Sequence, residues 1–265
     1  MSKENNMRHK ILIYRDYGCT DVAALENELK KYFMPRGCSV GFTDAAGIIK
    51  NDELNDEVLA FFMPGGAGTP FRRKLEFLGN DKIREYVRQG GIYYGICAGA
   101  YYACEQVVFE KDIPELKIIS ACGLNLIDGK AVGTLYKEFG ILPYAKNAAA
   151  SAAVGIVWNK DRERHIAHYH GGPYFELNEQ SQSEVLAYYD LPEKLPAIVR
   201  RNFGNGAIVA SGVHYEDSGE ALFKTIHGLR LDSVQAQNVA QKLADAESER
   251  QSLFNKIMAL SAQRI

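Results

Sequence analysis

Short apolar runs alternate with helix-like segments along the first hundred residues, and this alternation restricts the fold more than any other feature. Strand-like runs are expected at 11–14, 39–42, 58–63 and 92–96. Between them, apolar residues recur every three or four positions, as in the segment that starts near Thr20 and ends before Pro35. The pattern predicts an α/β fold: a three-layer sandwich whose central sheet is mostly parallel and has helices on both faces.

The second half of the chain carries a different pattern. Residues 118–176 are less regular and richer in Gly and Ala, with short strands expected near 154–158 and 166–169. The stretch 196–216 predicts a hairpin, because two apolar runs flank a turn around "FGNG". We therefore expect an antiparallel extension beside the parallel strands.

No linker or internal repeat divides the chain, so a single domain is expected. It should cover residues 10–232, after a disordered tail at 1–9. The apolar residues of 233–265 follow a heptad-like spacing that Arg250 interrupts. This spacing predicts one long C-terminal helix packed on the domain, and a homodimer through that helix is the second interpretation.

The composition excludes several classes of protein. A chain with 46% hydrophobic residues, 24% charged residues and a net charge of −2 has no basic footprint for nucleic acid. No apolar run approaches the ~18 residues of a membrane span, and the start has no signal-peptide core, so a cytoplasmic protein is expected. Five cysteines without a C-x-x-C pair argue against a disulfide framework. The expected partner is a small-molecule substrate or ligand, with no membrane partner, cofactor or metal.

The first candidate functional residue is Cys97, in the stretch "GICAGA" that follows the apolar run 92–96. A G-x-C-x-G segment between strand and helix is the cysteine counterpart of the nucleophile elbow. Gly95 and Gly99 leave room for the sharp turn, and the following helix would favour the thiolate. A buried core thiol is the alternative, and for an isolated cysteine it is the better one.

A second element supports the nucleophile. His214 and Glu216, in "SGVHYE", lie two residues apart just after an apolar strand. In extended chain such residues point the same way, so Glu216 can hold the tautomer of His214. A cysteine, a histidine and an orienting acid follow the general logic of a triad.

A third element is "MPGGAG", which follows the apolar run 58–63. Backbone N–H groups at Gly65 and Gly66 could approach a developing oxyanion, with the N–H of Ala98 as the partner donor. Three such elements at three strand ends, where ligands bind in parallel sheets, predict one shared site.

Three histidines in "HIAHYH" raise a metal hypothesis. On a strand, His168 and His170 would share one face and His165 would lie on the other. No acid or cysteine stands nearby at ligand spacing, so we do not expect a metal. We expect instead that one of these histidines borders the cleft through its neighbour Gly171.

The motifs "MPGGAG", "GGIYYGICAGAYYA", "HYHGGPYF" and "SGVHYE" resemble those of one family. It is the class I glutamine amidotransferase-like domain found at the N-terminus of eukaryotic biotin–protein ligases and as free-standing bacterial proteins. The resemblance runs from about Lys10 to His227. It implies a flavodoxin-like sandwich with a triad at Cys97, His214 and Glu216. It also implies an oxyanion region at Gly65, Gly66 and Ala98, with Gly171, Gly172 and Tyr101 lining the same cleft.

Two departures bear on the activity. Glutamine amidotransferases usually carry Gln four residues after the nucleophile, where this chain has Tyr101, and Pro between His and Glu, where it has Tyr215. We therefore expect a cysteine hydrolase or amidase for which glutamine is a poor substrate. The G-R-G-R-x-G loop of biotin ligation is missing, so ligation is not expected. A catalytically idle binding or regulatory domain and a reactive-thiol sensor are the competing interpretations.

Overall fold

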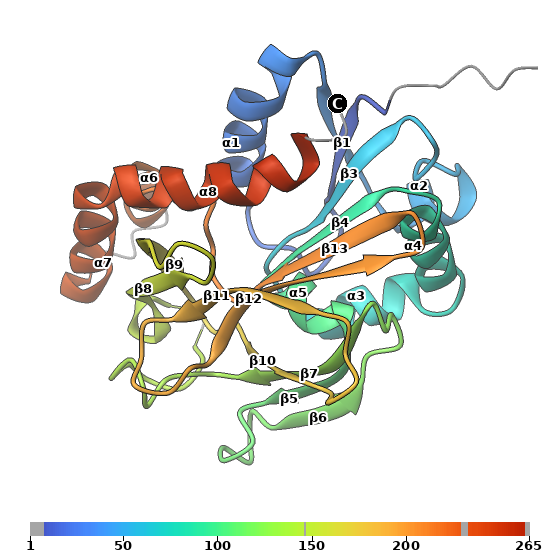
Figure 1. The fold of residues 1–265 in the computed structure, drawn as a ribbon. Helices are drawn as coiled ribbons and strands as arrows, with labels where there is room; N and C mark the ends of the chain where they lie inside the picture. Colours follow the sequence, from blue (N-terminus) through green and yellow to red (C-terminus); the bar gives the residue numbers. More distant parts are fainter. Residues whose placement is uncertain (1–7, 146, 229–232, 263–265) are drawn as a thin grey trace, which may run out of the picture.

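A mixed α/β architecture surrounds one large sheet (Figure 1). The computed structural model describes residues 8–145, 147–228 and 233–262, and in these residues nine strands form that sheet. Five neighbouring strands are parallel: β2 (Ser39–Thr43), β1 (Lys10–Tyr14), β3 (Val58–Met63), β4 (Ile92–Ile96) and β13 (Gly206–Ser211). The antiparallel strands continue from there: β12 (Pro196–Phe203), β11 (Glu184–Tyr189), β8 (Ala152–Trp158) and β9 (Arg164–Tyr169).

Helices cover both faces of the parallel strands, because successive side chains on a strand point to opposite faces. Phe61 and Tyr93 pack with the helices α2 to α5, whereas Phe62 and Tyr94 pack with α1 and α8. The rings of Phe62 and Tyr94 stack at 4.5 Å. The helices are α1 (Ala23–Phe33), α2 (Ala45–Lys50), α3 (Gly68–Leu75), α4 (Leu78–Arg88), α5 (Ala98–Ala103), α6 (Gly219–Gly228), α7 (Val234–Asp245) and α8 (Glu247–Ala262).

The strands expected in the first half are confirmed, but the start of the first helix is wrong. That helix begins at Ala23, with Val22 as its N-terminal cap rather than Thr20. Thr20 is held elsewhere, since its N–H donates to the carbonyl of Gly65 at 3.1 Å. The antiparallel extension and the hairpin of β12 and β13 are also confirmed.

A second, four-stranded sheet lies below α5 and was not predicted (Figure 1). Its strands, in spatial order, are β10 (Tyr174–Leu177), β7 (Ile127–Gly133), β5 (Cys104–Phe109) and β6 (Ile118–Ala121). Strand β5 follows α5 directly, so this sheet supports the helix that comes after Cys97.

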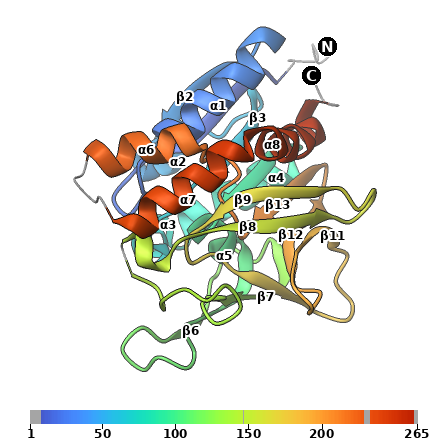
Figure 2. The same cartoon turned by 90° about the vertical axis from the view of Figure 1, so that its left-hand side faces the viewer.

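The single long helix predicted for 233–265 is wrong. The described residues form two helices, α7 and α8, which meet at Ala246. Ser233 caps α7 by accepting the N–H of Ala236 at 3.1 Å. Both helices lie across β8 and β9 (Figure 2), and Leu253 and Ile257 of α8 are fully buried there. In the described residues the tail therefore packs against the large sheet.

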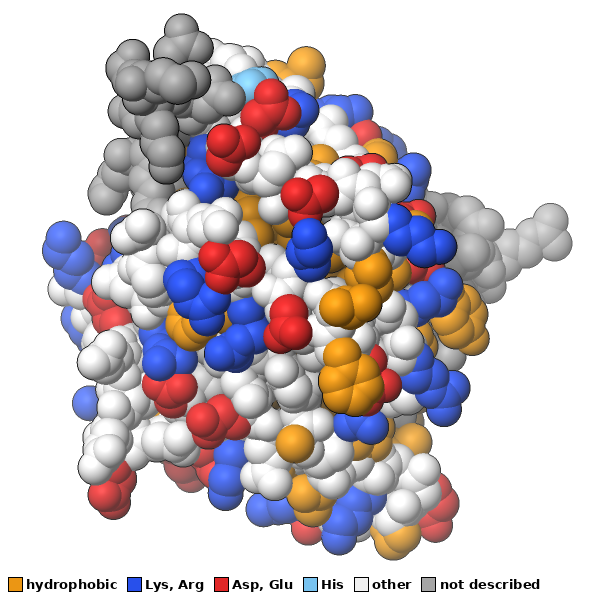
Figure 3. All heavy atoms as spheres, turned by 90° about the vertical axis from the view of Figure 1, so that its right-hand side faces the viewer, with side chains coloured by type: hydrophobic (Ala, Val, Ile, Leu, Met, Phe, Trp, Pro, Cys, Tyr) orange, Lys and Arg blue, Asp and Glu red, His pale blue; other side chains and the backbone are white. Residues whose placement is uncertain are grey.

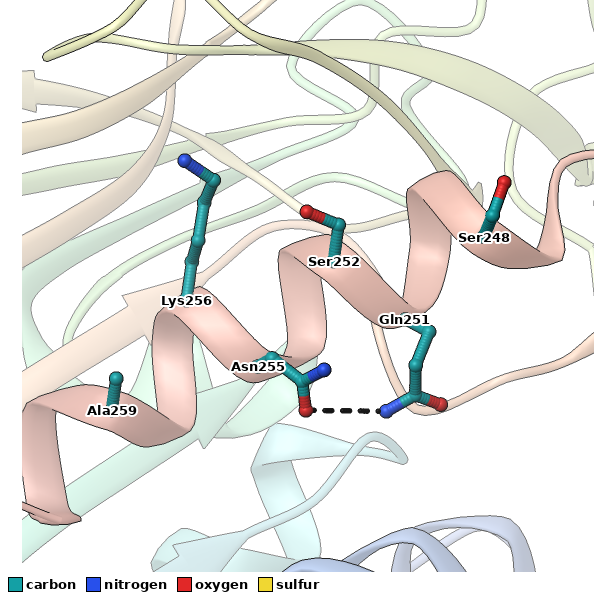
Figure 4. Close-up of a pocket in the computed structure, with 6 residues that line it drawn as sticks. All are labelled: Ser248, Gln251, Ser252, Asn255, Lys256 and Ala259. Atoms are coloured by element: carbon teal, nitrogen blue, oxygen red, sulfur yellow. Dashed lines mark hydrogen bonds between the residues drawn. The ribbon is translucent and has the colours of Figure 1, made fainter.

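The outer face of α8 is polar. A hollow of about 570 Å³ lies along this face (Figure 4). The residues that line it are Ser248, Gln251, Ser252, Asn255, Lys256 and Ala259. A homodimer through this helix stays a prediction. Residues 1–7 of the expected N-terminal tail and 263–265 of the expected helix lie outside the described residues.

The surface over α2 and α4 mixes basic and acidic side chains (Figure 3), in keeping with the small net charge. Lys82 pairs there with Asp52 at 2.6 Å. Within the described part of the chain, no helix has the length and apolar character needed to cross a membrane.

Candidate active site

Three neighbouring strands of the parallel sheet end at one edge. In the register of the sheet, Met63 of β3 lies beside Gly95 of β4, and Ile96 of β4 lies beside Ser211 of β13. The segments that follow these strands therefore meet, as the sequence predicted. They carry the glycine pair, Cys97 and the His214 segment.

Cys97 turns the chain sharply from β4 into α5. Its φ of 49° and ψ of −104° are unusual for a residue with a side chain and cost on the order of 1–3 kcal/mol. Three backbone bonds hold it: its N–H donates to Ser211 O at 2.9 Å, and its carbonyl accepts the N–H groups of Ala100 and Tyr101, each at 3.0 Å. A Cβ on Gly95 would lie 2.5 Å from the carbonyl oxygen of Gly99, so the turn requires glycine there. The strained conformation predicted for Cys97 is present.

His214 lies between Cys97 and Glu216. Its Nδ1 donates to Oε1 of Glu216 at 2.8 Å. Burial alone lowers the pKa of His214, but the Glu216 carboxylate and the nearby Cys97 side chain raise it well above the usual value. The raised pKa favours the imidazolium, which is the form that pairs with a thiolate.

Glu216 is 5% exposed, and burial raises the pKa of its carboxyl group. The neighbouring His214 opposes that rise. The other acid, Asp217, has a lowered pKa: burial raises it, but the hydrogen bond from His168 and the nearby positive groups together outweigh the burial. Two adjacent carboxyl groups therefore have pKa values shifted in opposite directions, an arrangement common at functional sites.

The glycine pair borders the imidazole. A Cβ on Gly65 would lie 2.7 Å from Cε1 of His214, so a larger residue would displace the ring. Gly66 has a φ of 143° and forms an antiparallel bridge with Cys19. The backbone hydrogen bonds of this bridge are made by the chain neighbours of Cys19 and Gly66, not by these two residues themselves. The N–H of Gly66 therefore points away from Cys19. Ala98, the other expected donor, is the first residue of α5.

The segment from His170 to Gly172 lies beside Cys97 and the start of α5. The Cys97 sulfur lies 3.5 Å from the carbonyl oxygen of His170. Tyr101, predicted to line the substrate cleft, donates its hydroxyl to the carbonyl of Gly171 at 3.1 Å and is nearly buried. This bond ties the segment to α5, and burial raises the pKa of the Tyr101 hydroxyl well above its usual value.

His168, Asp217 and Ser151 also lie here, and their arrangement was not predicted. Nδ1 of His168 is 2.7 Å from Oδ2 of Asp217, and its Nε2 accepts the Ser151 hydroxyl at 2.5 Å. The rings of His168 and His214 are 5.5 Å apart, and the N–H of His214 donates to His168 O. The sequence held two signals for this arrangement. Alternate residues along β9 face the same way, and an acid directly follows Glu216.

The side chains of the three histidines in "HIAHYH" do not meet at one site. As expected, His165 faces away from the other two, and its Nδ1 bonds to Glu249 O at 3.0 Å. Nε2 of His170 bonds to Ala145 O at 2.9 Å, and burial lowers the pKa of His170 to about 4. In the described part of the chain, His214, Glu216 and Asp217 could offer a metal three ligand atoms within 4.8 Å. Of these atoms, Nδ1 of His214 is already bonded to Glu216.

Comparison with known proteins agrees with this architecture. The sequence matches the family described as biotin-protein ligase, N terminal, over residues 9–263. An uncharacterized protein of Chlamydia muridarum is 31% identical over 181 residues, which is 67% of each chain. A biotin–protein ligase of Schizosaccharomyces pombe is 30% identical over 141 residues, 52% of this chain but 22% of the ligase. A glutamine amidotransferase structure from Thermotoga maritima aligns with a TM-score of 0.57 at 15% identity, covering 97% of this chain and 98% of that one.

Proposed function

The chain belongs to the family of biotin-protein ligase N-terminal domains, and we propose that it is a cysteine-dependent hydrolase or amidase acting on a small carbonyl substrate. The observation that carries the proposal is the strained Cys97 beside His214, whose imidazole is held by Glu216. The likeness to a glutamine amidotransferase supports the fold, and the five parallel strands between helices support a flavodoxin-like arrangement of that part.

The proposed reaction begins with attack of the Cys97 thiolate on the carbonyl carbon. The raised pKa of His214 keeps a proton on the imidazole, which delivers it to the leaving amine or alkoxide. Glu216 holds Nδ1 and so aims Nε2 at the reacting groups. The N–H groups of Ala98 and Gly66 are the proposed donors to the oxyanion.

The second half of the reaction releases the acyl group. Once it has lost its proton, His214 takes one from water, and the resulting hydroxide attacks the thioester carbon. The Cys97 sulfur leaves as thiolate and restores the ion pair with the imidazolium. No cofactor enters this scheme.

Glutamine is not the proposed substrate. The Tyr101 hydroxyl already donates to Gly171 O. A phenol also lacks the paired donor and acceptor that a Gln side chain presents to the amide of a substrate. Ammonia release from glutamine should stay well below ~1 s⁻¹, the lower range of ordinary enzymes. A coupled ammonia assay checks this, and release at or above that rate would show the inference to be wrong.

Biotin ligation is not part of the proposal either. The match covers 22% of the Schizosaccharomyces pombe ligase, so the activity of that whole protein does not transfer to this chain.

The test is intact-mass screening against a panel of amides, esters and electrophilic probes. We expect an adduct or acyl-enzyme of the wild-type protein that peptide mapping places on Cys97 and that the Cys97→Ala variant does not form. Cys38→Ala is the matched control, because Cys38 is also buried but burial raises its pKa. A silent Cys97 in folded protein would favour the idle binding domain.

A further inference from the structure

Ser151, His168 and Asp217 repeat the order of groups found at Cys97. The Ser151 hydroxyl donates to Nε2 of His168 at 2.5 Å, and Nδ1 of His168 faces Oδ2 of Asp217 at 2.7 Å. A nucleophile, a base and an orienting acid in this sequence of bonds define a hydrolytic triad by geometry rather than by chain order. None of these three residues has a role in the reaction proposed for Cys97.

Three separate parts of the chain bring the groups together. Ser151 stands between a short helix (η2, Ala148–Ala150) and β8, while His168 lies on the neighbouring strand β9. Asp217 follows β13 and reaches His168 because the backbones at His168 and His214 form an antiparallel bridge. Their proximity therefore depends on the tertiary fold and not on local sequence.

The exposure of Ser151 is close to that of Cys97. Ser151 is 5% exposed and Cys97 is 8% exposed. Asp217 is 3.8 Å from Nδ1 of His214, so the two sets are neighbours, but each histidine has its own closest carboxylate. A reagent small enough to reach one nucleophile meets a similar degree of burial at the other.

A hollow of about 350 Å³ lies between β8 and α7; the three residues of the set do not line it, but chain neighbours of Ser151 do. It is lined by Ala152 and Ala153, the two residues that follow Ser151, and by Gln235. The side-chain amide of Gln235 donates to the backbone carbonyl of Ser151 at 3.2 Å. Gln241 and Lys242 of α7 line the hollow too, so it suits a small ligand with a polar or anionic end.

We infer that Ser151 is a second nucleophile, served by His168 and Asp217, for small esters with a polar or anionic end. The Ser151 oxygen bonds to the acyl carbon while its proton passes to Nε2 of His168. The imidazolium, stabilised by Asp217, then gives that proton to the departing alkoxide. Water, activated by the same imidazole, releases the acid and restores the serine.

The test uses the whole protein and an alkyl fluorophosphonate probe. The Ser151 oxygen would bond to phosphorus, fluoride would leave, and His168 would take the proton. We expect one adduct by intact mass, placed on Ser151 by peptide mapping, in both the wild-type and Cys97→Ala proteins. Because this readout does not need Cys97, its failure is distinguishable from failure of the function proposed above.

Variants decide whether His168 activates the serine. His168→Gln should slow the labelling of Ser151 by about 100-fold or more, as expected for loss of a general base. Asp217→Asn should slow it too, and circular dichroism identifies any variant that fails to fold. Ser252→Ala is the matched control, because the Ser252 hydroxyl bonds to a carboxylate, Glu163, without a histidine. It should label like the wild type.

Three outcomes would overturn the inference. The first is folded wild-type protein that gives no adduct on Ser151. The second is an adduct on a different serine. The third is labelling of Ser151 at an unchanged rate in a folded His168→Gln or Asp217→Asn variant, which would leave the hydrogen bonds with a structural role alone.

Discussion

The parallel half of the large sheet carries Cys97 and the antiparallel half carries Ser151, and the two halves hold these proposed nucleophiles differently. Cys97 sits at the carboxyl end of a parallel strand, in a strained turn before a helix. Ser151 precedes the antiparallel strand β8 and is absent from the non-glycine residues with positive φ. The parallel half therefore offers backbone donors and a helix N-terminus, whereas the antiparallel half offers activation by a base alone.

The largest expected effect concerns Arg250, which ties the two halves together. It is fully buried on α8, donates to the carbonyl of Tyr215 at 2.8 Å and pairs with Glu28 at 3.0 Å. Arg250→Ala should lower the free energy of unfolding by about 3–5 kcal/mol. It leaves the buried Glu28 with only Lys31, an exposed partner, and removes the donor to the Tyr215 carbonyl. Urea denaturation measures this.

Lys256→Ala on the same helix is the control. Lys256 pairs with Asp161 and with Glu163, both of which are more exposed, and its loss should cost about 0–1 kcal/mol. Equal losses for the two variants would mean that the buried pair does not join the halves.

The next effect tests the base of the parallel half. His214→Gln should slow the alkylation of Cys97 by iodoacetamide at pH 7 by about 100-fold. The raised pKa of His214 keeps the imidazolium, and so its positive charge beside the sulfur, in place as pH rises through neutrality.

Peptide mapping after brief labelling makes this measurement, with the other thiols as internal references. In the wild type, Cys97 should lead, and Cys38 and Cys104 should lag because burial raises their pKa values. Labelling led by Cys19 or Cys38, with Cys97 unreactive, would return Cys97 to the role of a core thiol.

A smaller effect is expected from Gly65→Ala. The added Cβ would meet Cε1 of His214 at 2.7 Å and push the ring from its position. Alkylation of Cys97 should slow on the order of tenfold, since a shift of about 1 Å in a reacting group can cost as much as 100-fold. Gly68→Ala is the control, because a Cβ there meets no atom of the described residues within 4 Å. An unchanged rate in Gly65→Ala would contradict a close fit between this loop and the imidazole.

The smallest effect concerns the antiparallel half. Ser151→Ala should lower the free energy of unfolding by about 1 kcal/mol, through loss of one hydrogen bond to His168. Thermal unfolding of this variant beside Ser252→Ala, expected within about 0.5 kcal/mol of the wild type, measures the difference. A loss well above that for Ser151→Ala would point to a mainly structural serine.

The sequence predicted the site in the parallel half because its signals are local. Apolar strands that end at Met63 and Ile96 are followed at once by small residues, and His214 and Glu216 are two positions apart. Adjacent parallel strands then bring their ends together without further information.

The antiparallel half could not be predicted in this way. His168 meets Asp217 only because β9 passes beside the end of β13, and no spacing in the sequence encodes that approach. The break between α7 and α8 lies at Ala246, which is neither Gly nor Pro and so gives no local signal. The strands of the second sheet were missed because β6 has four mostly exposed residues and β5, half-buried along most of its length, shows no alternation.

The bond between Tyr94 and Ser261 bears on how the protein is made. Tyr94 lies on the strand that leads to Cys97, and its hydroxyl bonds to the Ser261 side chain, 167 residues later. At ~5–20 residues per second of synthesis, Ser261 is made roughly 8–33 s after Tyr94. During that time the strand lacks the helix that covers it. His214 also leaves the ribosome long after Cys97, so the nascent thiol has no base beside it for most of translation.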